Sequence, residues 1–253
     1  MSQNGHDRRF TGRTVIVTGA GSGIGRATAV RVATEGGHVV AADLDPARLA
    51  GLVEQCGEES VTAIAGDITE PETVARIVAA GGHRIDGLAN IAGIMDGFLP
   101  PSEVDDAVWD RVLGLNLTAT MRLTRAVLPA MIEAGRGSIV NVASEAALRG
   151  SAAGAAYTAS KHAVVGYTAS VAFFHGPQGV RANTVAPGPT ITGIDGGMRS
   201  EYAAGRGGPV MQATMPAPAA PEQVAASIVW LLSDDAANIN GVVLPSDGGW
   251  SVA

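Results

Sequence analysis

The chain has 253 residues, of which 46% are hydrophobic and 16% are charged, and its formal net charge is −7. This length suffices for one α/β domain with a large core, and the low charged fraction fits a sheet that is covered on both faces and a surface that is partly buried in an oligomer. The acidic balance, without any run rich in Lys or Arg, argues against a nucleic-acid partner.

The chain begins with a polar and charged stretch, residues 1–13, which lacks the apolar core of a signal peptide. No window of 18 uninterrupted apolar residues follows it, so we expect neither a membrane span nor a membrane partner. The only cysteine, Cys56, excludes an intramolecular disulfide and favours a reducing compartment. The five histidines lack the spacing of metal ligands. We therefore expect a cytoplasmic protein without a metal site.

From Arg13 onward, short runs rich in Val, Ile and Ala alternate with longer amphipathic stretches. This alternation is typical of βα units that build a parallel sheet. Strands are predicted at residues 14–18, 38–42, 61–65, 87–90, 138–142, 180–186 and 242–245. Helices are predicted at residues 23–35, 46–56, 71–80, within 105–133, at 155–176 and at 222–232, with Asp45 as the N-cap of the second helix.

Residues 188–220 interrupt this alternation and are too long for a plain connector. They hold two Gly-Gly pairs and most of the sequence Pro-Ala-Pro-Ala-Ala-Pro, which offer few regular hydrogen bonds, so we expect a lid that is mobile without ligand. No internal repeat or low-complexity linker marks a second domain. The prediction is one domain over residues 1–253, a doubly wound, Rossmann-like α/β fold of three layers with a mostly or wholly parallel seven-stranded sheet.

A glycine-rich run lies between the first predicted strand and the first predicted helix. At this place the N-terminus of a helix can bind a pyrophosphate through its backbone N–H groups. The key glycines are Gly19, Gly23 and Gly25, with one residue more between the first two than in the usual dinucleotide fingerprint. Taken alone, the run could also be a plain glycine-rich turn.

Asp43 follows the second predicted strand, 18 residues after Gly25. A carboxylate there can accept hydrogen bonds from the hydroxyls of an adenosine ribose and repel a 2′-phosphate, which favours NAD over NADP. We expect no cation to cancel this charge. The residue after Asp43 is the uncharged Leu44, the glycine-rich run carries the uncharged Ser22, and Arg26 lies inside the first helix. Without the glycines, Asp43 could as well be a turn or capping residue.

Tyr157 and Lys161 are four residues apart and therefore share one face of a predicted helix. By itself such a pair is more often surface than catalytic machinery. Here Ser144 precedes Tyr157 by 13 residues and stands just after a predicted strand. Open α/β sheets bind their ligands at the carboxyl ends of their strands, so the three residues are candidates for one site.

Together these residues resemble the short-chain dehydrogenase/reductase family. The resemblance spans about residues 11–249 and rests on matches in the family's order. The matches are Thr18-Gly-x-x-x-Gly-x-Gly25, Asp67, Asn90-Ile-Ala-Gly93, Asn116, Ser144, Tyr157-x-x-x-Lys161, Asn183, Pro187-Gly188 with Thr192, and Asp247-Gly-Gly249.

The resemblance implies an enzyme that transfers a hydride between NAD(H) and a secondary alcohol or ketone, with Tyr157 as general acid/base. It implies catalytic roles for Asn116, Ser144, Tyr157 and Lys161. It further implies three groups of cofactor contacts. At the adenosine end these are Gly19, Ser22, Gly23, Ile24 and Gly25 at the pyrophosphate, Asp43 at the ribose, and Asp67 and Ile68 at the adenine. The next wall is formed by Asn90, Ala92 and Gly93, and the nicotinamide end is bound by Pro187, Gly188, Thr190, Thr192, Tyr157 and Lys161.

Two departures from the family pattern concern the scaffold. The stretch from Asp67 to Asn90 is about one helical turn shorter than is usual in the family, and Phe174 stands where the family commonly has Glu on an interface helix. A homotetramer, frequent in the family, or a homodimer fits this apolar, lightly charged chain.

The implied mechanism needs a base that is ionised near neutrality, and tyrosine is a poor one. Lowering its pKa from about 10 towards 7 takes roughly 4 kcal/mol, which one cation at about 4 Å can supply at an effective dielectric of 20. By resemblance Lys161 is that cation, helped by oxidised nicotinamide, and it also holds the nicotinamide ribose. Ser144 fixes the substrate oxygen, and Asn116 anchors a water that joins Lys161 to solvent.

Substrate contacts are expected from Met95, Ser144, Glu145, Ala146 and Tyr157, and an apolar, medium-sized substrate is favoured. Leu148 and the lid residues Met198, Met211 and Met215 belong either to this pocket or to the core. Two alternatives stay open. One is an NADPH-dependent ketoreductase, and the other is a cofactor-binding regulator without turnover, which an assay of nicotinamide oxidation and reduction would distinguish.

Overall fold

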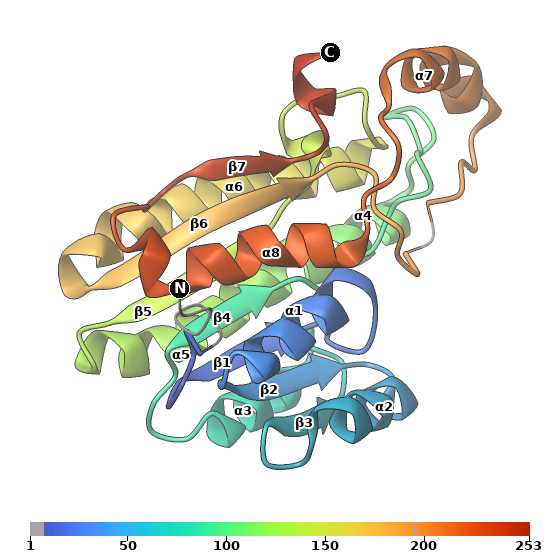
Figure 1. Cartoon of the computed structure of the whole chain (residues 1–253). Coiled ribbons are helices and arrows are strands. Elements are labelled where there is room, and N and C mark those ends of the chain that lie inside the picture. Colours follow the sequence, from blue (N-terminus) through green and yellow to red (C-terminus); the bar gives the residue numbers. More distant parts are fainter. Residues whose placement is uncertain (1–7, 195) are drawn as a thin grey trace, which may run out of the picture.

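Seven strands form one sheet at the centre of the molecule, in the order β3-β2-β1-β4-β5-β6-β7 (Figure 1). The computed structural model describes residues 8–194 and 196–253. All pairings are parallel, so the predicted fold is confirmed and the sheet is parallel throughout. The strands are β1 (Thr14–Thr18), β2 (His38–Asp43), β3 (Val61–Ala65), β4 (Gly87–Asn90), β5 (Gly137–Val142), β6 (Val180–Pro187) and β7 (Val243–Ser246).

Two layers of helices cover the sheet (Figure 1). Along β1, Val15 and Val17 pack in one core with side chains from α1, α2 and α8, whereas Ile16 packs on the other face with α3, α5 and α6. Successive side chains of a strand point to opposite faces, so the strand feeds both cores. The helices are α1 (Gly23–Thr34), α2 (Pro46–Cys56), α3 (Pro71–Ala80), α4 (Asp106–Leu113), α5 (Thr120–Glu133), α6 (Ala155–His175), α7 (Glu201–Thr214) and α8 (Pro221–Leu232).

Most element boundaries agree with the sequence-based prediction to within one residue. The predicted N-cap of α2 is confirmed, because the Asp45 carboxylate accepts hydrogen bonds from the backbone N–H groups of Ala47 and Arg48. Helix α3 has the ten residues predicted for it, so the short stretch before Asn90 still holds a complete helix. In the part of the chain that the structure describes, no helix is long and apolar enough to cross a membrane.

The long helical stretch after β4 is not uniform. Between α4 and α5 the chain forms a π-helix over Gly114–Ala119. A π-helical turn holds one more residue per hydrogen-bonded ring than an α-turn, is rare, and is frequent at functional sites. This turn carries Asn116, whose side chain it places inside the molecule.

The lid, residues 188–220, corrects one expectation. We expected few regular hydrogen bonds there, yet α7 occupies fourteen of its residues in spite of Pro209 and the neighbouring glycines. A local cap and tertiary packing offset the poor helix propensity: the Ser200 hydroxyl caps the helix by accepting from Ala203 N, and Met211 is buried against the domain. Asp195, which also belongs to the predicted lid, lies outside the described residues.

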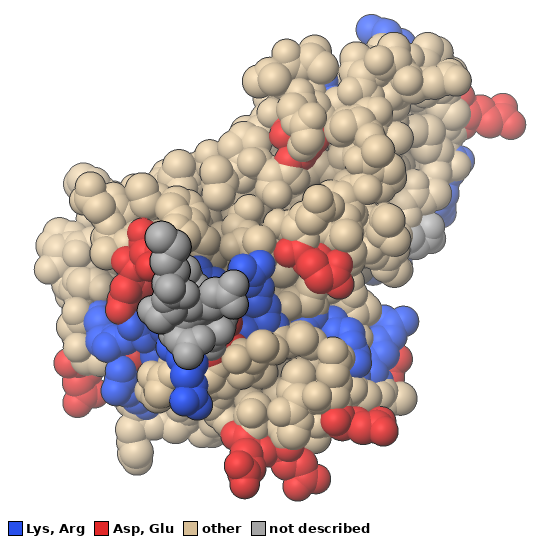
Figure 2. All heavy atoms as spheres, viewed as in Figure 1, with Lys and Arg blue, Asp and Glu red and all other residues tan. Residues whose placement is uncertain are grey.

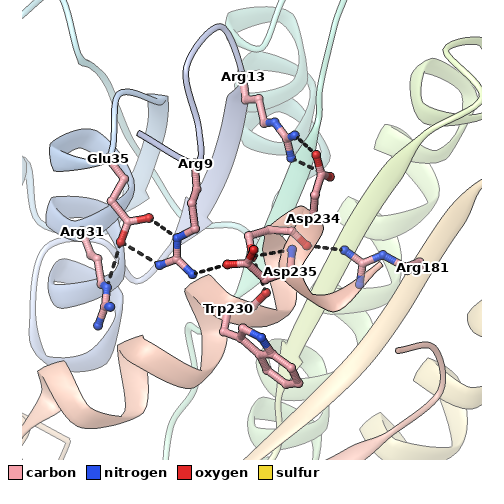
Figure 3. A network of polar contacts seen from close by, with 9 residues as sticks. Arg9, Arg13, Arg31, Glu35, Arg181, Trp230, Asp234 and Asp235 are labelled. Carbon is pink, nitrogen blue, oxygen red and sulfur yellow. Dashed lines mark hydrogen bonds and ion pairs between the residues drawn. The ribbon is translucent and has the colours of Figure 1, made fainter. Parts of the chain in front are cut away.

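The amino-terminal edge of the sheet carries a network of ion pairs (Figure 3). Arg9 binds Glu35 through two hydrogen bonds of 2.6 and 2.7 Å and also reaches Asp235 at 3.3 Å. Arg13 pairs with Asp234 in the turn that follows α8. The network therefore ties the chain before β1 to the ends of α1 and α8, at the opposite edge from the candidate site.

Candidate active site

A cavity of about 420 Å³ opens at the carboxyl ends of the strands. Strands β1 and β4 are neighbours although α1 to α3 separate them in the chain, so the sheet order reverses here, and ligands of doubly wound folds bind at such a reversal. Residues that follow β4, β5 and β6 line the cavity, together with α6 and part of the lid. Helix α7 stands above this edge in Figure 1.

Ser144, Tyr157 and Lys161 meet in this cavity, as the sequence predicts. Ser144 follows β5, and Tyr157 and Lys161 come from the first two turns of α6. Ser144 lies close enough to the phenol of Tyr157 for its hydroxyl to lower the pKa of that phenol. The ammonium group of Lys161 lies 5.4 Å from the centroid of the Tyr157 ring and donates a hydrogen bond of 2.9 Å to the carbonyl oxygen of Val142. All three side chains thus reach one end of the cavity.

The pKa values of this cluster differ from the expected ones. Burial raises the pKa of Tyr157 to about 12, an effect that the hydrogen bond with Ser144 reduces and the negative charge of Asp96 increases. Burial also lowers the pKa of Lys161 to about 8. The protein groups by themselves do not move the phenol pKa towards 7, because both groups are desolvated and the ammonium donates to a backbone carbonyl; the expectation also counts on the positive charge of oxidised nicotinamide.

Asn116 is 1% exposed and makes three side-chain hydrogen bonds. Its Nδ2 donates to the carbonyl oxygen of Ile94 at 3.0 Å and to Ser160 Oγ at 3.1 Å, and its Oδ1 accepts from Ile94 N at 2.9 Å. A Cβ at Gly93 would stand 3.2 Å from Asn116 Oδ1 and 3.4 Å from Lys161 Nζ, so both groups border the same wall. Asn116 thus joins the loop after β4 to α6.

The glycine loop after β1 fits a bound pyrophosphate. Helix α1 begins at Gly23, and the Ser22 side chain makes no capping bond within the described chain, so the first N–H groups of α1 are left for a ligand. A Cβ at Gly25 would overlap the carbonyl oxygen of Gly19, and one at Gly23 would lie 2.9 Å from the Thr192 side chain. These glycines therefore let the loop pack closely on the start of α1 and on Thr192, and Ile24 lines the adjoining cavity.

Asp43 ends β2 beside this loop. Its Oδ2 accepts a hydrogen bond from Gly21 N at 2.9 Å, and its Oδ1 accepts one from Asp45 N at 3.0 Å. A carboxylate has about four acceptor positions, so two of them stay free for ribose hydroxyls. Among the described residues no ion pair to Asp43 is found: a Cβ at Gly21 would be 2.8 Å both from Asp43 and from the Arg48 Cβ, but the Arg48 guanidinium pairs with Asp45 at 3.2 Å.

The remaining predicted cofactor residues divide into lining and supporting ones. Gly93, Pro187, Gly188, Thr190 and Thr192 line the cavity. Ala92 contacts Gly19, and Ile68 is buried in the core near Asp67, whose Oδ1 accepts from Thr69.

Asn90 directs its side chain away from the cavity. Its amide is buried and donates inward to Asn141 Oδ1 at 2.8 Å and Thr124 Oγ1 at 3.2 Å, so it supports the wall from behind instead of facing the cavity.

The predicted substrate contacts are correct only in part. Met95 lines the cavity, as do Met211 and Met215 of the lid. Glu145 and Ala146 are fully buried in the turn after Ser144 and do not line it, because Glu145 points inward to an ion pair with Arg149. Met198 and Leu148 lie at the surface, 39% and 40% exposed, and are not among the lining residues.

The sequence analysis missed Trp250 as a lining residue. Its ring lines the cavity, its indole Nε1 donates to Thr214 Oγ1 at 3.1 Å, and the Arg149 guanidinium stands 4.8 Å from its ring centroid. Trp250 directly follows the matched motif Asp247-Gly-Gly249, which was the available signal. Through Thr214, the C-terminal segment holds the end of α7 over the cavity.

Comparison with known proteins agrees with this geometry. A family model described as "short chain dehydrogenase" matches residues 13–203. The chain is 40% identical over 250 residues to a short-chain dehydrogenase/reductase of Talaromyces verruculosus, with 94% of this chain and 96% of the relative covered. It is 38% identical over 264 residues to 3beta-hydroxysteroid dehydrogenase 2 of Eggerthella lenta, with 99% of each chain covered.

Solved structures are similar along almost the whole chain. Levodione reductase superposes with a TM-score of 0.87 at 35% identity, covering 96% of this chain and 99% of that one. A putative NAD(P) dependent gluconate 5-dehydrogenase from Beutenbergia cavernae, which contains NADP at low occupancy, superposes with a TM-score of 0.86 at 36% identity, covering 98% and 100%. The match of the family model and these whole-length likenesses show that the chain belongs to the short-chain dehydrogenase/reductase family of NAD(P)-dependent oxidoreductases.

Proposed function

We propose that this protein transfers a hydride between NAD(H) and a secondary alcohol or its ketone, and that Tyr157 is its general acid/base. The observation that carries the proposal is that Tyr157, Ser144 and Lys161 line one cavity together with Gly93 and Pro187, with the Lys161 ammonium 5.4 Å from the centroid of the Tyr157 ring. A phenol in such a place can take a proton from a substrate hydroxyl or return it to a ketone oxygen.

The protein residues hold and move the proton. Ser144 donates a hydrogen bond to the substrate oxygen, and the Oη atom of Tyr157 takes the hydroxyl proton during oxidation. Lys161 holds the nicotinamide ribose, and Asn116 anchors a water that passes protons between Lys161 and solvent. When bound, oxidised nicotinamide accepts the hydride and places a positive charge near the phenol of Tyr157. This charge would lower the phenol pKa, which burial raises to about 12 in the protein alone.

The proposed cofactor preference is for NAD. Asp43 supports it, since its carboxylate stands beside the glycine loop and would repel a 2′-phosphate. Use of NADPH for ketone reduction is the second candidate, and Arg48 favours it, because the stem of this cation lies beside Asp43. The Arg48 side chain is 54% exposed, and its guanidinium pairs with Asp45 at 3.2 Å. In this second candidate the guanidinium moves a short way to bind the 2′-phosphate of NADPH.

The proposed substrate is apolar and of medium size. Met95, Phe98, Met211, Met215 and Trp250 supply large apolar surfaces to the cavity. Such a lining favours a hydrocarbon skeleton that carries a single reacting oxygen. The similarity to a levodione reductase and to a hydroxysteroid dehydrogenase agrees with a cyclic skeleton. In this proposal the lid, residues 188–220, gains order as cofactor and substrate bind.

The proposal includes self-association to a homotetramer or homodimer in the cytoplasm. Phe173 and Phe174 are 75% and 66% exposed near the end of α6, and paired apolar rings of this size are costly to leave in water. In Figure 2 the surface over β6, β7 and α6 bears few charged side chains, whereas charges are frequent over α1 to α3. A partner copy at this side would also cover the open edge of β7.

A substrate screen tests the proposed function. Purified protein is mixed with NAD⁺, NADP⁺, NADH or NADPH and a panel of cyclic and open-chain alcohols or ketones, and the absorbance of reduced nicotinamide is followed. We expect turnover of apolar cyclic substrates, with NAD(H) the better cofactor. Absence of turnover with every pair, in protein that binds NADH, would favour the non-catalytic regulator.

A further inference from the structure

Asp96 is a buried carboxylate for which the sequence analysis found no role. It lies in the loop between β4 and α4, close to the cavity-lining residues Met95 and Phe98, and is 1% exposed. Its Oδ1 accepts a hydrogen bond from Phe98 N at 3.0 Å, and its Oδ2 accepts one from Tyr157 N at 2.9 Å. The second bond links this loop directly to the backbone of the proposed acid/base, 61 residues further along the chain.

The bond to Tyr157 replaces a missing helix cap. Helix α6 begins at Ala155, so Tyr157 is its third residue, and the N-cap position holds Gly154, which has no side chain. The N–H groups of the first turn have no acceptor within the helix and need one from elsewhere. The loop supplies two, because Asp96 accepts from Tyr157 N and the carbonyl oxygen of Leu99 accepts from Ala155 N at 2.9 Å.

The close packing of the loop on α6 depends on Gly154. A Cβ at this position would lie 2.5 Å from both carboxylate oxygens of Asp96 and from Leu99 N. Such distances are well below van der Waals contact, so any larger residue would push the loop away from the helix. A Ser or Asp at the N-cap position 154 would therefore occupy the space in which the Asp96 carboxylate lies.

The same loop is fixed at its other end. The side chain of Asn116 binds both the N–H and the carbonyl oxygen of Ile94, two residues before Asp96. Asn116 Nδ2 also donates to Ser160 of α6, and Ser160 Oγ donates to the carbonyl oxygen of Tyr157 at 2.7 Å. Asp96 and Asn116 therefore hold the backbone of Tyr157 at its nitrogen and, through Ser160, at its oxygen.

We propose that Asp96 is a positioning residue for Tyr157, because it caps α6 from the loop after β4 and so fixes the phenol relative to Ser144 and Lys161. Charge strengthens the cap, since a carboxylate binds N–H groups more tightly than a neutral acceptor and is favoured at the N-terminus of a helix. The proposal rests on the proposed function of Tyr157, but its structural part can be measured without turnover.

The same charge has an electrostatic consequence for the phenol. The groups that face Tyr157 are Lys161 on its own helix, Ser144 after β5 and Asp96 in the loop, with the Glu145–Arg149 pair behind Ser144. Of these, Asp96 opposes phenolate formation by Coulomb repulsion. Replacing Asp96 by Asn keeps one acceptor and removes the charge, so the phenol should ionise at lower pH although the cap is weaker.

The test uses Asp96→Asn and Asp96→Ala in the full chain, with Asp105→Asn and Asp105→Ala as matched controls. Asp105 caps α4 by accepting from Val108 N at 2.7 Å, and α4 bears none of the proposed site residues. We expect Asp96→Ala to lower kcat at least tenfold while the Kd for NADH changes less than about threefold, since small displacements of a reacting group can cost up to about a hundredfold. The Asp105 variants should lose thermal stability and keep kcat.

A second measurement follows the phenol itself. The chain has three tyrosines, so the ring carbons of labelled tyrosine give a simple spectrum in which Tyr157→Phe identifies the Tyr157 signal. Between pH 8 and 12 we expect Asp96→Asn to lower the midpoint of Tyr157 ionisation by at least about half a pH unit, as removal of a nearby anion should, and Asp105→Asn to leave it unchanged. A role in folding alone would not move this midpoint.

Three outcomes would overturn the proposal. One is an unchanged kcat in folded Asp96 variants, another is an unchanged ionisation midpoint in Asp96→Asn, and the third is an equal loss of kcat in the Asp105 variants. If neither Asp96 variant folds, hydrogen exchange of the Tyr157 amide in the wild type decides, and exchange as fast as in a free loop contradicts the cap. Absence of turnover in the wild type would contradict the proposed function. The titration of Tyr157 and the hydrogen exchange of its amide would still test whether Asp96 caps α6.

Discussion

The two edges of the sheet hold their charged and polar groups in opposite ways. At the amino ends, Arg9 is paired with Glu35 and Asp235 (Figure 3), and the buried Asp86 accepts from Arg84 at 2.9 Å and from Thr14 N at 3.0 Å. At the carboxyl ends, Tyr157 and Lys161 are buried, and the Lys161 ammonium donates to the carbonyl oxygen of Val142 instead of pairing with a carboxylate. Burial moves the pKa values of both groups away from their ordinary ones. The ion pairs at the amino ends stabilise the fold, whereas the buried groups at the carboxyl ends remain able to bind a ligand.

A large loss of turnover is expected when the cation of the site is removed. Lys161→Met should lower kcat by roughly a hundredfold or more, within the range of a lost acid/base contribution, because the proposed hold on the nicotinamide ribose and on the proton path disappears. Steady-state kinetics at saturating cofactor measures the loss. A kcat within threefold of the wild type would exclude Lys161 from the mechanism.

Lys161→Met should also raise the thermal stability at neutral pH, whereas loss of a paired charge at the amino ends should lower it. Burial lowers the pKa of Lys161 from 10.5 to about 8, so below pH 8 the folded protein bears the full cost of a buried charge. As pH rises from about 8 to 10.5, the unfolded chain binds more protons than the folded one, and the cost is relieved. The advantage of Lys161→Met in thermal unfolding should therefore be largest below pH 8 and shrink above it.

A smaller effect is expected at the adenosine end of the cleft. Asp43→Ala should narrow the ratio of kcat/KM for NAD⁺ over NADP⁺ by about ten- to a hundredfold, because the repulsion of a 2′-phosphate and the acceptor for the ribose are both lost. Arg48→Ala is the matched control, since it removes the neighbouring cation and should weaken NADP⁺ only. Equal use of both cofactors by the wild type would contradict the role given to Asp43.

These contrasts also explain which features could be predicted from the sequence. The glycine loop, Asp43, and the Tyr157–Lys161 pair are local patterns whose spacing survives any packing, and the structure brings them to one edge of the sheet. Helix α7 was missed because its glycines and Pro209 argue against a helix, and only the cap by Ser200 and the burial of Met211 offset them.

Long-range contacts account for the other errors. Asp96 reaches Tyr157 across 61 residues, a contact that no local pattern around either residue predicts. The direction of the Tyr157 pKa shift also depends on burial, which the spacing of two residues on a helix does not reveal. Asn90 matched the family's motif, yet its amide turns towards Asn141, and a motif carries no information about the direction of a side chain.

The smallest effect is expected at the exposed end of the amino-edge network. The hydrogen bond from Arg13 holds the pKa of Asp234 below its ordinary value, so this carboxylate stabilises the fold above its unfolded pKa and loses that contribution as pH falls through its lowered pKa. Its side chain is 77% exposed, and solvent screens the pair. Asp234→Asn should cost no more than about 0.5 kcal/mol at pH 7, and a loss of several kcal/mol in urea unfolding would contradict this.

The most direct test of the contrast between the edges compares Tyr157→Phe with Asp86→Asn in the same two assays, turnover and thermal unfolding. Tyr157→Phe should remove nearly all turnover and preserve both Tm and NADH binding, because the proton acceptor is lost while the cofactor contacts remain. Asp86→Asn should lower Tm by several degrees, since its buried carboxylate also forms an ion pair with Arg136 at 3.1 Å, and should leave kcat within about twofold. Comparable turnover in Tyr157→Phe, or a loss of kcat in Asp86→Asn that matches it, would contradict the account.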